Sequence, residues 1–150
     1  SAAPDLEHAM VPPPKLTLEQ AKACATEGIE VLRSADAQAK FVALAQEVED
    51  NEYDAVKRMH KETLLEKRVL RDAFMKQKYG CKDGGDVQHV FTDMAMLRDL
   101  NSDKELGDLL ETLFSLMPSD RKAEQAKMDQ EKAAKEAAKE EAKAAPAAPA

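Results

Sequence analysis

Apolar positions recur along most of this chain at intervals of three, four and seven residues, the spacing that places side chains on one face of an α-helix. Each such stretch begins or ends near residues that favour a helix terminus. The stretches cover residues 17–33, 36–50, 52–79, 87–97 and 102–117. This pattern predicts an all-α protein with about five core helices packed in a small irregular bundle.

Three helix starts carry a capping signal. Thr17 with Gln20, and Ser102 with Glu105, have the spacing of a capping box, in which each side chain bonds the other residue's free backbone N–H. Asp36 is the residue that we expect to cap the second helix. These signals predict helices that begin at residues 17, 36 and 102.

The third helix is predicted to be the longest, because residues 52–79 contain no Gly or Pro. Gly80 follows at the position where glycine commonly ends a helix. Lys67 stands where the next apolar contact should fall, so we expect the apolar stripe to break there and part of the helix to face solvent or a partner. In the first helix, Gly28 lies on the apolar face, where it would allow another backbone to approach closely.

Composition agrees with helices and divides the chain into three parts. The sequence has four Phe, two Tyr and no Trp, so a core must be built from Leu, Val, Met and Ala. Residues 1–16 are rich in proline, which predicts an extended arm. Residues 17–117 are the predicted helical core domain. Residues 118–150 are Ala blocks spaced by Lys and Glu, which predict a charged helical tail that becomes extended at its Ala-Pro end.

The net charge of −7 is unevenly distributed. Residues 1–56 have a net charge of −7, residues 57–82 of +6, residues 83–118 of −6, and the remainder of 0. The basic segment either complements its acidic neighbours within the bundle or offers a positive face to a partner. The basic residues concerned are Lys57, Arg58, Lys61, Lys67, Arg68 and Arg71. No basic residues are interleaved with aromatic ones, so we expect no nucleic-acid binding.

The fifth predicted helix has an apolar face wider than a surface helix requires. We interpret it first as a central core element and, as an alternative, as a docking face for another protein. The candidate contact residues are Leu113, Phe114, Leu116 and Met117.

The residues that resemble catalytic or metal-binding patterns are incomplete. An acidic run at residues 50–54 lacks the turn glycine and the final Glu of a calcium loop. Asp86 and His89 have the spacing of two metal ligands on one helix, but no second copy accompanies them. Cys24 and Cys81 leave a single bridge open, and we expect Cys81 to be exposed, with a modestly favoured thiolate. We therefore predict no enzyme activity, no cofactor and no metal.

Two functions remain. The first is a non-catalytic accessory or adaptor subunit, a scaffold that binds neighbouring proteins in a larger multi-subunit complex. The alternative is a freestanding regulator that binds a partner through the basic face of the third helix. No run is long and apolar enough to span a bilayer. Ser1 at the start is compatible with Met excision or with removal of a targeting segment, and we expect an organelle, the mitochondrion first, with the cytoplasm as the alternative.

Overall fold

The structure, a computed structural model, describes residues 13–144, and this part of the chain is helical with no β-strand. The all-α prediction is confirmed. All five predicted core helices are present, the third of them as two helices. The predicted tail helix is also present, and one short helix lies before the last core helix without having been predicted. In chain order the helices are α2 (Leu18–Arg33), α3 (Ala35–Asn51), α4 (Ala55–Leu70), α5 (Lys76–Tyr79), α6 (Gly84–Met96), α7 (Arg98–Asn101), α8 (Lys104–Ser115) and α9 (Pro118–Ala144).

Both predicted ends of the chain lie partly outside the described residues. Residues 1–12 of the proline-rich arm and residues 145–150 of the tail are not described. Leu16, at the end of the predicted arm, is 7% exposed and belongs to the core. The predicted tail is helical over Pro118–Ala144.

The helix starts confirm one capping prediction and correct two. Thr17 and Gln20 form both bonds of a capping box at the start of α2. At α3 the cap is Ser34, whose Oγ accepts a bond from the backbone N–H of Ala37, whereas Asp36 lies inside the first turn. At α8 the cap is Asp103, whose Oδ1 lies 2.9 Å from the backbone nitrogen of Leu106. In both cases a polar residue one or two positions away occupies the cap position instead.

The long third helix predicted for residues 52–79 is divided by a π-helical turn over Arg71–Met75, between α4 and α5. A π turn accommodates one extra residue per turn, and here two consecutive residues, Phe74 and Met75, are both buried. Gly80 ends α5 as predicted, with a φ of 70° in the left-handed region.

Two glycines lie where a neighbouring helix leaves little room for a side chain. A methyl group at Gly28 of α2 would lie 2.9 Å from Cδ1 of Leu113 on α8, so side chains, and not the predicted backbone, fill the space beside this glycine. A methyl group at Gly84, the first residue of α6, would overlap the backbone carbonyl of Leu64 on α4. The crossing of α4 and α6 therefore depends on glycine at position 84.

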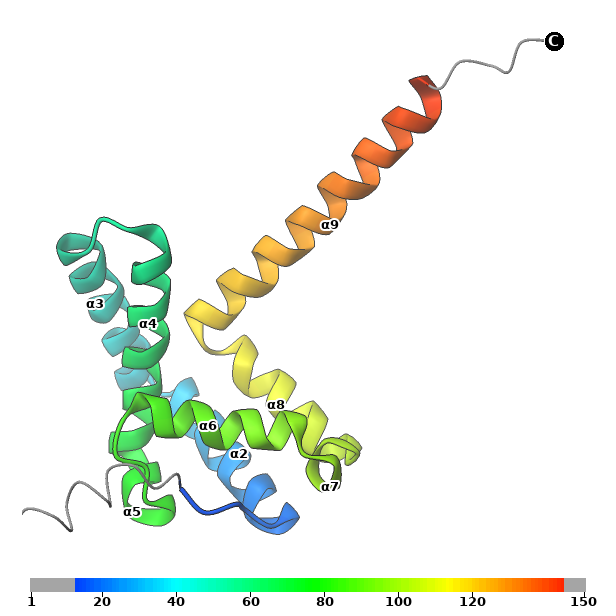
Figure 1. The fold of residues 1–150 in the computed structure, drawn as a ribbon. Coiled ribbons are helices and arrows are strands. Elements are labelled where there is room, and N and C mark those ends of the chain that lie inside the picture. The colour runs from blue at the N-terminus through cyan, green and yellow to red at the C-terminus, as the bar shows by residue number, and fades with distance from the viewer. Residues whose placement is uncertain (1–12, 145–150) are drawn as a thin grey trace, which may run out of the picture.

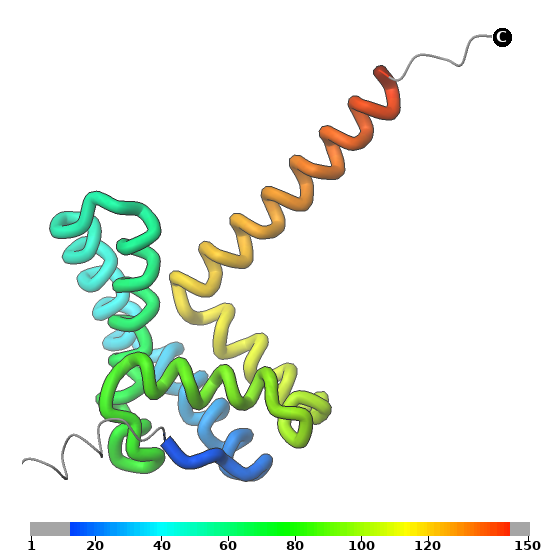
Figure 2. The backbone as a smooth tube through the Cα atoms, in the orientation of Figure 1, coloured from blue at the N-terminus to red at the C-terminus, as the bar shows by residue number. Residues whose placement is uncertain are grey.

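The helices form a body with two projections (Figure 1). Buried core residues come from α2, the N-terminal half of α3, the C-terminal half of α4 with the π turn, α6, α7 and α8. The distal part of the α3–α4 hairpin extends from one side of this body, and α9 extends from the end of α8 in a different direction (Figure 2). The body thus fixes the base of each projection and leaves most of α9 uncovered.

Candidate interaction surfaces

A buried polar cluster joins the base of α9 to the C-terminal end of α4. The carboxylate of Glu66 accepts bonds from the backbone N–H of Ser119, at 3.1 Å, and from the Ser119 hydroxyl. The ammonium of Lys67 lies 3.2 Å from Oδ2 of Asp120 and donates to the sulfur of Met117 at 3.6 Å. Glu66 is 4% exposed, Lys67 1% and Ser119 4%. We call these four residues, Glu66, Lys67, Ser119 and Asp120, the α9 clamp.

The clamp places a carboxylate at the N-terminus of α9. Unpaired N–H groups and the helix dipole make this end of a helix favourable for a negative charge. Burial raises the pKa of Glu66, and the bonds from Ser119 and the charge of Lys67 oppose that shift. Every buried side-chain nitrogen or oxygen in residues 13–144 has a hydrogen-bond partner. The cluster is therefore satisfied, which a buried polar group requires.

Lys67 corrects one sequence-based expectation. We predicted that the apolar stripe breaks at Lys67, that part of the helix faces solvent or a partner, and that Lys67 is a candidate contact residue. Instead it is among the most buried side chains of the described residues, because α9 brings Asp120 over it. In this conformation Lys67 contacts Asp120 and Met117 of the chain itself.

The other candidate basic residues differ in exposure. Lys57, Lys61 and Arg68 are exposed, whereas Arg58 and Arg71 are half-buried. Lys61 lies 2.7 Å from the carboxylate of Glu52. Arg71 pairs with Asp72 at 2.7 Å and donates to the backbone carbonyl of Lys82.

The apolar candidates on the last core helix also separate. Leu113 and Met117 are completely buried, which favours the core interpretation for them. Phe114 and Leu116 are half-buried and pack against the core. The ring of Phe114 meets that of Phe91 on α6 edge to face, with centroids 6.0 Å apart.

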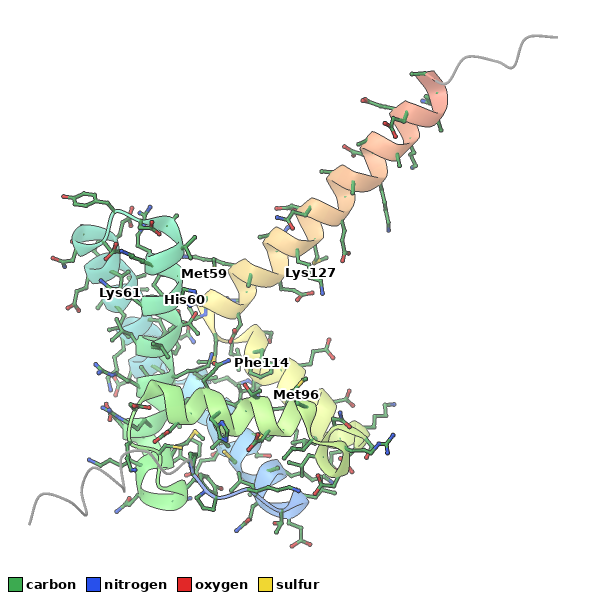
Figure 3. The ribbon with its side chains drawn as sticks, in the orientation of Figure 1. Met59, His60, Lys61, Met96, Phe114 and Lys127 are labelled. Carbon is green, nitrogen blue, oxygen red and sulfur yellow. The ribbon has the colours of Figure 1, made fainter. Side chains whose placement is uncertain are left out.

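Exposed apolar side chains gather near the distal end of the α3–α4 hairpin. Tyr53 is 93% exposed, Val56 61% and Met59 51%. Met59 lies on the side of α4 that faces α9 (Figure 3). It borders a groove of about 450 Å³ whose other wall includes Ala123 and Ala126 of α9.

The cysteines are free thiols inside the protein, so the expected exposure of Cys81 is wrong. Both Cys24 and Cys81 have no exposed surface. Burial raises the pKa of Cys24 to about 12 and that of Cys81 to about 11. The sequence placed Lys82 and Lys78 near Cys81, but burial, together with Asp86 and Asp83, opposes the thiolate.

The residues with metal-ligand spacing have other partners. Asp86 accepts a bond from the backbone N–H of Lys82 at 2.8 Å, and Nε2 of His89 lies 3.4 Å from the carboxylate of Asp93. Asp54 caps α4 through the backbone N–H groups of Val56 and Lys57. Across residues 13–144, no group of three or more His, Cys, Asp or Glu side chains is arranged to hold a metal ion.

Comparison with known proteins finds no significant match among protein families, curated proteins or solved structures. No helix within residues 13–144 is long and apolar enough to cross a membrane. The structure itself defines the class, a small all-α bundle from which one long charged helix projects.

Sequence reasoning did not find the α9 clamp. Pro118 in the first turn of α9, followed by Asp120, is a readable sign of a helix start. Glu66 and Lys67 each lie 53 residues before their partners, Ser119 and Asp120. No local spacing signals that contact.

Proposed function

We propose that this protein is a non-catalytic accessory or adaptor subunit, which binds neighbouring proteins in a larger assembly. The observation that carries this proposal is the combination of an anchored base and an uncovered length in α9. The helix has 27 residues and thus a length of about 40 Å, and within Pro118–Ala144 only Ser119 is buried.

A helix that served only as a solubilising spacer would have no use for a fixed direction. The α9 clamp fixes that direction by burying ionisable groups, which is costly unless they are paired. An arm held in this way is suited to reaching along a neighbouring protein. The exposed apolar side chains of the α3–α4 hairpin give a second area for such contacts.

The proposal is tested by native purification of the tagged full-length chain from its source. We expect co-purification of other subunits at constant stoichiometry through a salt wash and a second, unrelated separation step. The compartment of that assembly also tests the expected mitochondrial location. Recovery of a lone 16.5 kDa species would overturn the proposal.

A variant pair isolates the contribution of α9. Ala133→Pro interrupts the helix about three and a half turns beyond the clamp, where all side chains are exposed, so the body should remain folded. Ala133→Gln keeps the helix and serves as the control. Loss of assembly in the Pro variant alone would agree with a role for the arm, whereas equal assembly of both variants would remove α9 from the proposal.

A freestanding regulator is the second candidate, and one observation favours it. Lys57, Lys61 and Arg68 share an exposed face of α4 with Leu64, which is 46% exposed. A regulator that uses this face would bind one partner reversibly, with an affinity that falls as salt rises. Substituting Lys57 and Arg68 by Gln should abolish such binding and leave a salt-resistant assembly unchanged.

A further inference from the structure

Two residues of this protein are not explained by its own fold. Gly107 lies within α8, is exposed, and a methyl group there would meet no atom within 4 Å in the part of the chain that the structure describes. Glycine inside a helix costs about 1 kcal/mol relative to alanine, and neither a positive φ nor a close crossing requires it here. Met128 is the large apolar side chain on the otherwise polar and alanine-rich α9, and it is 55% exposed.

Both residues line grooves that meet at Phe114. A groove of about 280 Å³ between α6 and α8 contains Gly107 and Leu110, and it reaches Glu111 and Phe114. A second groove, of about 760 Å³, shares Glu111 and Phe114 and continues to Met128 on α9. We call the two together the elbow groove, because α8 and α9 meet at a bend there (Figure 1).

The rim of the elbow groove adds apolar surface. Met96, at the end of α6, is 72% exposed and follows Ala95, which lines the α6–α8 part of the groove. Figure 3 shows Phe114 close to the bend, Met96 at the far end of α6, and Lys127 on α9. Apolar contact points are therefore present on α6, α8 and α9.

We propose that the elbow groove binds one amphipathic α-helix of a neighbouring protein, and that this helix places Lys or Arg side chains beside α8. This proposal rests on the accessory function proposed above. The α8 wall of the groove favours basic side chains beside it, whereas the α9 wall also carries Arg121 and Lys127. Asp108 and Glu111 are exposed on α8 and have no ion-pair partner within residues 13–144. Residues 83–118 together have a net charge of −6.

The absence of a side chain at position 107 favours a helix as the occupant. Glycine lets a second helix approach the backbone of α8 more closely than any other residue would. A helix satisfies its own backbone hydrogen bonds and so needs no strand edge, and residues 13–144 contain no strand that could pair with a β-strand peptide. An apolar ridge along the bound helix would cover Leu110, Phe114 and Met128.

The test uses a fluorescent synthetic helix of about five turns, with a Leu ridge and Lys along one flank (the Leu/Lys helix), and a matched helix with Glu at the Lys positions (the Leu/Glu helix). We expect the full-length protein to bind the Leu/Lys helix saturably, and the Leu/Glu helix at least tenfold more weakly. Gly107→Arg should abolish binding, because it fills the groove and adds positive charge. Met128→Gln should weaken binding about tenfold, since it removes apolar contact area.

Val42→Gln is the matched control, because Val42 is 74% exposed on α3 and lies away from the groove. Binding that is unchanged in Gly107→Arg, or lowered equally in Val42→Gln, would overturn the assignment. A dimer of the chain alone that Gly107→Arg disrupts would assign the groove to a second copy and would also overturn it.

The outcome is separable from that of the proposed function. If the native assembly forms with wild-type protein and equally well with Gly107→Arg and Met128→Gln, the accessory function stands and the elbow groove is not its contact. If wild-type protein is recovered alone, the accessory function fails, whatever the synthetic helix does.

Discussion

The buried ion pair of the α9 clamp predicts that its two partners differ greatly in their sensitivity to mutation. Lys67 is 1% exposed, whereas the side chain of Asp120 is 31% exposed. Asp120→Ala leaves an ammonium buried with the Met117 sulfur as its remaining hydrogen-bond acceptor. Lys67→Met leaves a carboxylate that already reaches water, and it places an apolar side chain beside Met117.

The expected losses in the free energy of unfolding follow from the different exposure of Lys67 and Asp120. Removing one partner of a buried pair typically costs about 3–5 kcal/mol. We expect Asp120→Ala to lie near the lower value, about 3 kcal/mol, because the carboxylate of Glu66 remains near Lys67 and lowers the cost of its charge. Lys67→Met should change the free energy of unfolding by less than about 1 kcal/mol, since the lost ion pair is offset by the avoided desolvation of Lys67.

Urea unfolding followed by circular dichroism measures both variants and the double variant. With a urea dependence of about 2 kcal/mol per molar, Asp120→Ala should lower the midpoint by about 1.5 M. Lys67→Met/Asp120→Ala should recover most of that loss, so the double-mutant cycle should give a coupling of about 3 kcal/mol. Equal losses in the two single variants would refute the argument, because they would show that Asp120 is as desolvated as Lys67.

Local release of α9 provides a check on the same experiment. If its first turn detaches in Asp120→Ala, Lys67 gains water and the global loss is smaller. Hydrogen exchange at residues 119–123 would then accelerate relative to the wild type, while α2 and α8 remain protected. Unchanged exchange together with an unchanged midpoint would contradict the clamp.

Three further predictions concern pH, thiol reactivity and glycine. Burial raises the pKa of Glu66 above its ordinary value of 4.5, so its contribution to stability is complete below that value and is lost as pH rises through the raised pKa. Relative to Glu66→Gln, the wild type should therefore lose stability in urea titrations as pH rises above 4.5. Cys24 and Cys81, whose pKa values are raised to about 12 and about 11, should react with a thiol reagent at pH 8 only at the rate of unfolding, and rapid labelling of the native protein would contradict their burial. Gly84→Ala should lower the free energy of unfolding by more than about 2 kcal/mol, because the added methyl group overlaps a backbone carbonyl. Gly107→Ala should raise the free energy of unfolding by up to about 1 kcal/mol. Calorimetry of the two variants measures both effects.

Features that depend on neighbours in the sequence were predictable here. The capping box at Thr17 and the left-handed end at Gly80 involve residues within four positions of each other, and both are confirmed. The two wrong caps, Asp36 and Ser102, were each displaced by a nearby polar residue. Capping chemistry identifies a helix start but does not choose among adjacent candidates, since several side chains satisfy the same N–H groups.

Features that depend on tertiary neighbours were not predictable. The stripe of α4 was expected to break at Lys67, because a lysine is seldom fully buried unless it is paired. Its partner Asp120 lies 53 residues later, on a helix that the sequence marks only as charged and solvated. The predicted exposure of Cys81 was wrong for a similar reason, since the burial of this residue depends on how the turn after α5 packs against the core. The π turn at residues 71–75 leaves the helical periodicity intact on both sides, so it gave no warning either.

The α9 clamp and the elbow groove both leave the isolated chain less stable than apolar packing at the same positions would. A clamp of buried ionisable groups adds little net stability compared with apolar packing, but it admits one pairing of helices where apolar surfaces would admit several. Gly107 lowers the helix propensity of α8, and Met128 exposes apolar area on α9. Neither cost is offset by a contact within the described residues. A helix direction that is fixed at the expense of stability, and an unfilled groove beside that helix, agree with the proposal that a neighbouring protein binds there. If so, filling the groove with Gly107→Ala and apolar pairing at Lys67 and Asp120 should give a more stable monomer that assembles less well.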